Sequence, residues 1–445
     1  MKRYNLTYPK IIALGFLLLI ATGTVLLMLP IASRDGQSVG FINALFTTTS
    51  ATCVTGLVVF DTYAHWTVFG QLVIICLIQI GGLGFMTIIT MFSFFLRRKI
   101  GLTERSLLRE SINTMYIGGI IRLTKKILYG TLIFEGVGAL LFSIRLIPKM
   151  GWATGIYNSV FLAISAFCNA GFDLMGRYQE YSSLTLFSGD AIISLTTCAL
   201  ITIGGLGFFV WDDLYEHKFH FSKYRLHTKI VLTVTSILIV FGTAAFLILE
   251  YNNTLAGMPF YEKVLAALFD AVTPRTAGFN STDVASLTPA SKLLMMIYMF
   301  IGGSPGSTAG GVKTTTIIVL FVTVWANLRN KNGMNIYRRR LENDALSRAT
   351  TVVCINLCLL TSVAFIISAL QPSLGLVNIF FEVFSAIGTV GITTGITRDL
   401  NVISKLLIIF LMYIGRVGSL SFATLFTQRK LKEKVQMPEE KINIG

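Results

Sequence analysis

A five-residue pattern that recurs four times in 445 residues constrains this chain more than any other feature. Each copy is a triplet of mostly small or polar residues, then a glycine, then a large apolar residue. The copies are residues 53–57, 168–172, 275–279 and 388–392. Their glycines are separated by 115, 107 and 113 residues. Such even spacing indicates a fourfold internal repeat, so we expect four similar units around one axis.

The composition indicates a membrane environment for these units. Apolar residues make up 53% of the chain, charged residues only 13%, and the mean hydropathy is +0.71. A soluble globule of this size needs more polar surface than that. The first apolar stretch, 11–29, is too long for a signal-peptide core and is not followed by an Ala-x-Ala cleavage site, so we predict a retained helix.

Each unit contains a long apolar segment, a short one and a second long one. The long segments reach the roughly 20 residues that cross a bilayer, and the short ones do not. The first long segments are 11–29, 127–147, 230–249 and 350–370. The short segments are 41–52, 156–167, 261–273 and 376–387. The last segments are 66–96, 188–211, 292–328 and 402–426.

The short segments are predicted to be re-entrant pore helices. A glycine loop at membrane depth must be shielded by protein or face a water-filled cavity. Ser-Ala stands six and five residues before the glycine in three units, whereas the third has Val272 and Thr273 followed by Pro274, so its pore helix should end differently. We predict an all-α integral membrane protein with four tandem helix–pore loop–helix units around a central, potassium-channel-like pore and eight transmembrane helices. The units are 1–98, 99–216, 217–330 and 331–427, followed by a tail, 428–445.

Backbone carbonyls that glycine allows to face inward can replace the water shell of a monovalent cation. The fourth loop, Thr389-Val390-Gly391, matches half of the potassium-channel signature, and the other loops match less well. We therefore predict a filter for potassium with incomplete discrimination against sodium. Its residues are Val54, Thr55, Gly56, Asn169, Ala170, Gly171, Thr276, Ala277, Gly278, Thr389, Val390 and Gly391.

A glycine-rich stretch interrupts the last segment of the third unit and must break its helix. We predict a flexible intramembrane gate that obstructs the pore from the inside. It comprises Gly302, Gly303, Ser304, Pro305, Gly306, Ser307, Thr308, Ala309, Gly310, Gly311, Val312, Lys313 and Thr314. It lacks the pattern of a phosphate-binding loop.

A second repeat, Ile-Gly-Gly, begins at residues 80, 203 and 301, and becomes Ile-Gly-Arg at 414. Glycine at this spacing indicates close helix packing, helices that line a common axis, or both. Arg416 therefore occupies a position that is glycine in the other units. A charge inside the membrane is a functional candidate, and Arg416 either repels cations below the filter or pairs with an acidic neighbour such as Glu382.

Other classes of function fit less well. Glu135, Asp270 and Glu382 form neither a spaced catalytic pair nor a metal cluster, and we expect them to cap pore helices or balance arginines, so we predict no enzyme and no bound cofactor. An alternating-access cation carrier with its substrate site at the broken helix is the alternative, but it predicts inverted repeats. Placing the amino terminus inside puts 26 of the 37 basic residues on one side of the membrane. This bias predicts that both termini are cytoplasmic and that the protein lies in the plasma membrane. We attribute the basic charge to this bias and to attraction to anionic lipid, and not to binding of nucleic acid.

With these features the chain resembles the Trk, Ktr and HKT superfamily of potassium-uptake proteins, above all the KtrB class of membrane subunits of bacterial Ktr systems. The resemblance covers essentially the whole chain. It assigns the four filter glycines, the gate to 302–314 and the barrier to Arg416. It also implies sodium-dependent potassium transport or symport, a homodimer with one pore per protomer, and a cytosolic KtrA-type ring that binds ATP, ADP or NAD. Basic segments 97–126 and 327–348 and the tail after 427 are candidate docking surfaces, or ordinary membrane flanks.

Overall fold

The computed structural model describes residues 8–84, 87, 101, 106–108, 120–218, 220–330, 333–342 and 344–419. Within these residues the regular structure is helical apart from one hairpin, in which β1 (Asn335–Ile336) pairs antiparallel with β2 (Arg339–Arg340). The prediction of an all-α protein is confirmed with this one addition. The segment 97–126 lies largely, and the tail after 427 entirely, outside the described residues.

The first helix of each unit is long and mostly apolar. These helices are α1 (Tyr8–Met28), α7 (Ile120–Met150), α11 (Leu226–Glu250) and α15 (Asp344–Leu370). In the described part of the chain these four are long and apolar enough to cross a membrane, and the bent pair α9 (Ala191–Leu206) and α10 (Phe208–His217) reaches that length when combined. A multi-pass membrane protein is therefore supported, and the number of eight spans stays a prediction.

The predicted short helices are all present. They are α2 (Phe41–Thr52), α8 (Trp152–Cys168), α12 (Phe260–Val272) and α16 (Leu376–Gly388). Three of them end in the same backbone turn, described below. The third, α12, ends just before Thr273 and Pro274 and lacks that turn, as its different sequence predicted.

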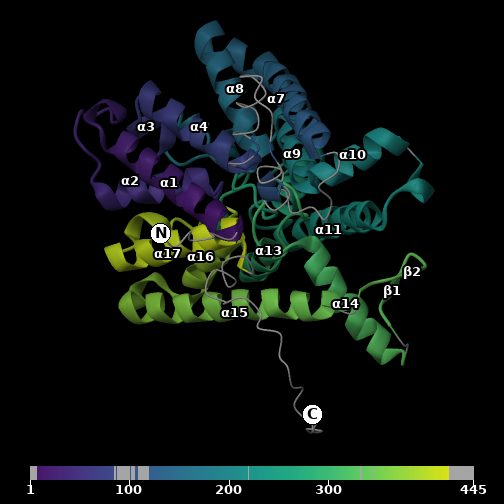
Figure 1. Ribbon diagram of the computed structural model, residues 1–445. Helices are drawn as coiled ribbons and strands as arrows, with labels where there is room; N and C mark the ends of the chain where they lie inside the picture. The colour runs from purple at the N-terminus through teal and green to yellow at the C-terminus, as the bar shows by residue number, and fades with distance from the viewer. Residues whose placement is uncertain are drawn as a thin grey trace.

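The four units are arranged in chain order around a common centre (Figure 1). The remaining helices are α3 (Thr62–His65), α4 (Val68–Leu83), α13 (Pro289–Phe300), α14 (Thr314–Leu328) and α17 (Val402–Val417). The second helix of each unit packs on the pore helix of the next: α4 on α8, α9 on α12, α13 on α16, and α17 on α2, which closes the ring. The repeat predicted from glycine spacing is thus a ring of interlocked units.

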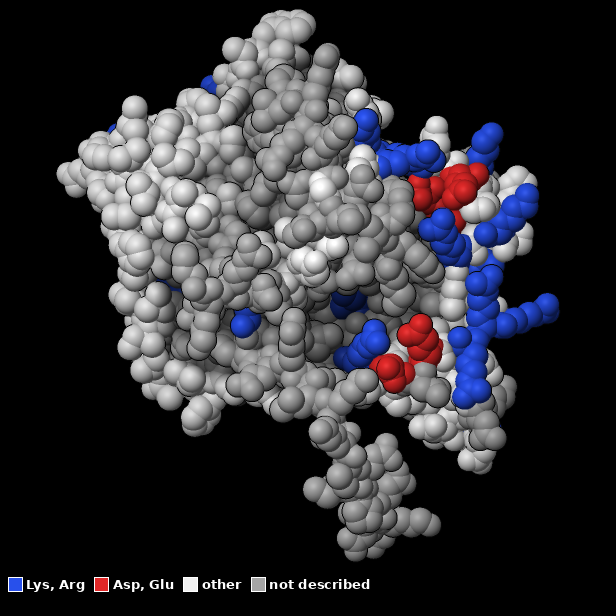
Figure 2. Space-filling view, viewed as in Figure 1, with Lys and Arg blue, Asp and Glu red and all other residues white. Residues whose placement is uncertain are grey.

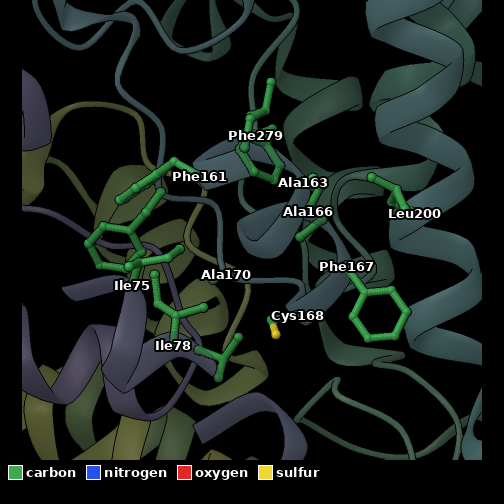
Figure 3. Packing of buried hydrophobic residues seen from close by; sticks show 14 of the residues in the cluster. Ile75, Ile78, Phe161, Ala163, Ala166, Phe167, Cys168, Ala170, Leu200 and Phe279 are labelled. Carbon is green, nitrogen blue, oxygen red and sulfur yellow. The ribbon is translucent and has the colours of Figure 1, made fainter. Parts of the chain in front are cut away.

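One of these contacts is seen in detail around α8. Ile75 and Ile78 of α4 and Leu200 of α9 lie on either side of this pore helix, against buried Phe161 and Phe167 (Figure 3). In lipid such packing is stabilised mainly by van der Waals contact rather than by exclusion of water. It holds the end of α8, and with it the loop that follows, in one position.

The second helices are not the continuous segments that the sequence suggested. Gly84, Gly207 and Gly418 follow α4, α9 and α17 with φ of 84°, 97° and 93°, and a left-handed residue ends an α-helix. The expectation of one helix over 188–211 is wrong, because α9 and α10 are bent by 94° at Gly207. In the third unit the break is the whole segment between α13 and α14.

Candidate functional site

The four filter glycines form a ring at the ends of the pore helices. A Cβ added to Gly56 would lie 2.6 Å from the carbonyl oxygen of Ala170 in the next loop. The same relation continues around the ring, with the corresponding contacts Gly171 to Ala277, Gly278 to Val390 and Gly391 to Thr55. Each glycine therefore abuts the carbonyl that precedes the glycine of its neighbour. The fold brings four carbonyl oxygens together around one centre.

The backbone before each glycine has the same unusual conformation. The second residue before the glycine is left-handed in every loop: Val54, Asn169, Thr276 and Thr389 have φ of 57°, 61°, 69° and 50°. Three of these residues are β-branched, for which this region is a genuine outlier. Such strain costs on the order of 1–3 kcal/mol per residue and is typical of functional sites.

A shared hydrogen-bond pattern maintains this conformation. The N–H of Thr55 donates to the Ser50 carbonyl at 2.8 Å, and the same bond joins Ala170 to Ser165 and Val390 to Ser385 at 2.8 Å. Together with a bond from the preceding residue, this is the Schellman turn that ends many helices, usually with glycine in the left-handed position. Each of these three pore helices therefore leads directly into its filter loop.

Serine hydroxyls fix two of the glycines. The N–H groups of Gly56 and Gly391 donate to the Oγ atoms of Ser50 and Ser385, both at 3.0 Å. These bonds turn the N–H groups into the protein wall. In the third unit Thr273 instead donates its hydroxyl to the carbonyl of Phe279 at 2.5 Å. The Ser-Ala pair was recognised in the sequence but its role was not, although the constant six-residue distance from the serine to the glycine is a signal for it.

Buried carboxylates hold the chain that follows the filter. Glu382 accepts hydrogen bonds from Thr393 at 2.6 Å and from Thr397, and Asp270 accepts one from Thr282 at 3.1 Å. The expectation that these acids cap pore helices or balance arginines is wrong for both. Each instead ties its pore helix to the segment that follows the glycine. A signal for this role was present in the sequence. In both units an acidic residue stands eight or nine residues before the glycine, and threonine or serine residues follow the glycine closely.

The predicted gate lies against the inner side of the filter loops. The hydroxyl of Thr308 donates to the carbonyl of Phe167 at 3.3 Å, directly before the second filter loop. A Cβ on Gly310 would collide with the hydroxyl of Thr389, in the fourth loop. The N–H of Ser304 donates to the carbonyl of Gly205 at 3.0 Å. The segment thus reaches from its own unit to the second and fourth.

Arg416 holds this segment in place. Its guanidinium donates to the carbonyl of Thr308 and to those of Gly81 and Gly82, the last at 2.9 Å. Arg416 therefore joins the fourth unit to the gate and to the first unit. Among the described residues no carboxylate pairs with it, so the alternative of an ion pair with Glu382 is wrong.

A second cation lies in the gate itself. Lys313 donates from Nζ to the carbonyl of Ala309 at 2.7 Å. Lys313 and Arg416 both line a cavity of about 610 Å³, together with Arg348 and Glu342 at the start of α15. Figure 2 shows lysine and arginine atoms inside the hollow near the middle of this face. The segment that resembles a gate thus separates this positively charged cavity from the ring of carbonyls.

Comparison with known proteins identifies the class. The family described as TrkH, cation transport protein, matches residues 7–435, so this chain belongs to that family of membrane cation transport proteins. It is 42% identical over 449 residues to the potassium/sodium uptake protein NtpJ of Enterococcus hirae, covering 100% of this chain and 98% of that protein. It is 41% identical over 446 residues to the Ktr system potassium uptake protein B of Bacillus subtilis, covering 100% and 98%.

A solved structure shows the same fold. The potassium transporter TrkH of Vibrio parahaemolyticus is only 18% identical but superposes with a TM-score of 0.76, covering 96% of this chain and 86% of that one. The resemblance that the sequence indicated is confirmed, and a cation transporter rather than an enzyme is what the family implies.

Proposed function

We propose that this chain takes up potassium through a pore whose filter is the ring of four glycine loops. The observation that carries the proposal is the cyclic contact of each filter glycine with the carbonyl of the next loop. Carbonyl oxygens at one level can replace the water around a dehydrated cation. Two relatives at above 40% identity over their full length are named for potassium uptake, which supports potassium as the ion.

The twelve filter residues contribute mainly backbone oxygens to this task. Their left-handed and glycine positions alternate, so successive carbonyls turn toward the same side of the loop. A single glycine in each loop provides fewer fixed rings than a full potassium-channel filter, which limits discrimination against sodium. The membrane potential drives uptake with roughly 2.3 kcal/mol per charge per 100 mV.

The segment 302–314 acts as the gate in this proposal. It lies beneath the filter, and its contact with Arg416 is to one backbone carbonyl, that of Thr308, which a rotation of the arginine side chain can release. Lys313 and Arg416 add a positive charge that opposes cation flow while the gate is closed. Opening therefore requires both the segment and the guanidinium to move.

The pore is favoured over an alternating-access carrier. The four units have the same order of helices and pack in one cyclic sense, without the inverted pair that such carriers use. The second helices of the first, second and fourth units end at corresponding glycines with positive φ, Gly84, Gly207 and Gly418. The second helix of the third unit ends at the segment 302–314, so an interruption is not confined to one substrate site.

The biological context follows from the relatives and the charge distribution. We propose a plasma-membrane homodimer, sodium-dependent, with cytoplasmic termini and contacts to membrane lipid. A KtrA-type nucleotide-binding ring is the proposed regulatory partner, as the name Ktr system of a relative suggests. Lysines and arginines gather just after α10, just after α14 and on the β1–β2 hairpin (Figure 2), which gives this partner a basic surface to contact.

The direct test is potassium and rubidium uptake in a potassium-transport-deficient bacterium that also produces a KtrA-type subunit. Gly391→Ser should abolish uptake or shift its preference toward sodium, because a Cβ there collides with the carbonyl of Thr55. Gly36→Ser is the matched control, since Gly36 also has positive φ but nothing lies within 4 Å of its Cβ position. Wild-type affinity and selectivity in Gly391→Ser would refute the filter.

The gate is tested with Arg416→Gln and with deletion of residues 306–311. Both should give uptake that no longer needs the regulatory partner. Arg348→Gln is the control for charge, because Arg348 lines the same cavity but its ion pair is a long one, 3.9 Å, to Asp344. Partner dependence that persists in both gate variants would refute the gate.

A further inference from the structure

One buried acidic residue, Glu135, has no role in the filter or gate proposed above. Glu135 lies halfway along α7, the 31-residue first helix of the second unit, and is 7% exposed. Its neighbours Leu132, Ile133 and Val137 are exposed on the lipid-facing side, so Glu135 points into the protein. A carboxylate at membrane depth is costly and marks a functional site by default.

The surroundings of Glu135 leave its charge unbalanced. The Oε2 atom accepts a hydrogen bond from the Gln79 amide at 3.2 Å, and Oε1 is buried without a partner. No lysine, arginine or histidine among the described residues forms an ion pair with it. A buried carboxyl group that stays ionised needs a compensating charge as well as hydrogen bonds.

A second buried oxygen faces the same side of α7. Thr131 precedes Glu135 by four residues, so the two side chains are neighbours on one helix face. Thr131 is 1% exposed and its hydroxyl makes no hydrogen bond, not even to its own helix. Two adjacent buried oxygens are therefore without partners, and they do not bond each other. A cation between the Glu135 and Thr131 oxygens would give each of them a partner. It would also hold the two oxygens farther apart than a direct hydrogen bond between them would.

We propose that Glu135, Thr131 and the side-chain oxygen of Gln79 form a sodium site outside the pore. One carboxylate balances one monovalent charge, and the remaining ligands are neutral oxygens of the kind that hard cations prefer. The described residues contain no group of three His, Cys, Asp or Glu side chains that could hold a metal, which is in keeping with a monovalent rather than a divalent ion.

The site is connected to the filter through two side chains. The Gln79 oxygen accepts a bond from the Cys168 thiol at 3.5 Å, and Cys168 immediately precedes the second filter loop, at Asn169 (Figure 3 shows Cys168 at the end of α8). To bind sodium, the Gln79 oxygen must turn from Cys168 toward Glu135. Occupancy of the site thus changes what holds the end of α8, which couples sodium to the filter.

This inference rests on the proposed function only for that coupling, so binding is measured apart from transport. Purified protein in lipid nanodiscs is equilibrated with radioactive sodium in excess potassium, which occupies the filter. Wild type should retain a sodium-binding component that potassium does not displace. Glu135→Gln should lose it, and Thr131→Val should weaken it by roughly tenfold, the size of effect seen when metal-site groups are removed.

Two controls and one alternative test variant make the result specific. Thr243→Val makes the same change in α11, where the hydroxyl only bonds its own helix at Ile239, and should bind sodium as wild type does. Gly391→Ser should also keep the component, because the site is separate from the filter. Thr131→Val carries the test if Glu135→Gln does not give a folded protein by size-exclusion chromatography.

The outcomes separate the site from the transport proposal. The site would be overturned if wild type lacked the sodium-binding component, or if Glu135→Gln kept it. It would also be overturned if Thr131→Val bound sodium as strongly as wild type, or if Gly391→Ser lost the component. Absence of potassium uptake by wild type, with the sodium component intact, would overturn the proposed function and leave the site standing. With both intact, Glu135→Gln should make potassium uptake insensitive to sodium, and sodium dependence equal to wild type would overturn the coupling.

Discussion

Replacement of Gly56 by alanine tests the geometry of the filter ring most directly. Two effects are expected. Gly56 has φ of 98°, and a left-handed conformation costs an L-residue roughly 1–2 kcal/mol. The new methyl would also lie 2.6 Å from the carbonyl oxygen of Ala170. Carbon–oxygen contacts are closest at about 3.3 Å, so that oxygen must move by about 0.7 Å.

A movement of this size exceeds what an ion site tolerates. Functional groups must be held within about 0.5 Å of their working positions. We therefore expect Gly56→Ala to reduce potassium uptake by at least tenfold, which corresponds to about 1.4 kcal/mol, and to reduce the preference for potassium over sodium. Stability should fall by at least the conformational cost of roughly 1–2 kcal/mol.

Gly40→Ala separates the two effects. Gly40 precedes the pore helix of the same unit with φ of 80°, and nothing lies within 4 Å of its Cβ position. It carries the conformational cost without the contact. Rubidium uptake, corrected for the amount of protein in the membrane, should be near wild type in Gly40→Ala. Equal loss of uptake in both variants would show that backbone strain, and not the ring contact, explains the result, and would refute the reasoning.

Three further predictions concern a filter loop, the contact between α11 and the start of α13, and the loop after the second filter. Ser50→Ala removes the acceptor of the Gly56 N–H, worth about 1 kcal/mol, and should lower the potassium preference several-fold in competition uptake; an unchanged preference would contradict the anchoring role. Glu250→Gln should lower the free energy of unfolding by about 2–3 kcal/mol in thermal melts, since Glu250 accepts bonds from both N–H and hydroxyl of Thr288, at 2.9 and 2.7 Å; a wild-type melt would speak against it. Burial raises the pKa of Asp173, in the loop after the second filter, from 3.8 to about 6. The contribution of Asp173 to stability is therefore present at low pH and is lost as pH rises through about 6. Asp173→Asn should make the melting temperature depend less on pH between about 4 and 6, and a pH dependence equal to wild type would refute this prediction.

The sequence predicted the pore helices well because their signal is local. The segment 41–52 coincides with α2 (Phe41–Thr52), and the glycine that follows it fixes its end. A twelve-residue apolar helix before a glycine has few alternatives at membrane depth. The left-handed conformation of Val54 could not be predicted, since nothing local favours it in a β-branched residue. It is imposed by the turn and by the neighbouring loops.

The bend at Gly207 was missed because its cause lies in another unit. A broken helix leaves an N–H without a partner, which in a membrane must be satisfied by protein. The N–H of Phe208 donates to the carbonyl of Gly306 at 2.7 Å, so the gate of the third unit completes the break in the second. The pattern Ile-Gly-Gly-Leu-Gly predicts close helix packing. This packing is observed, because a Cβ on Gly204 would collide with the carbonyl of Phe167. The sequence around Gly207 does not indicate that its neighbour Phe208 bonds the distant carbonyl of Gly306.

One departure from the fourfold pattern explains how a symmetric ring can be controlled. The position of Gly82 is glycine in three units, and a Cβ there would lie 2.7 Å from the sulfur of Cys168. In the fourth unit the same position is Arg416, whose side chain extends across the centre to the gate and to the first unit. Gly82 allows α4 to pack closely on Cys168, whereas the one large residue at this position reaches two other units. In the proposed gate, this single departure from a repeated motif therefore supplies both the charge and the contact with Thr308, whereas the proposed filter keeps its glycine in all four units.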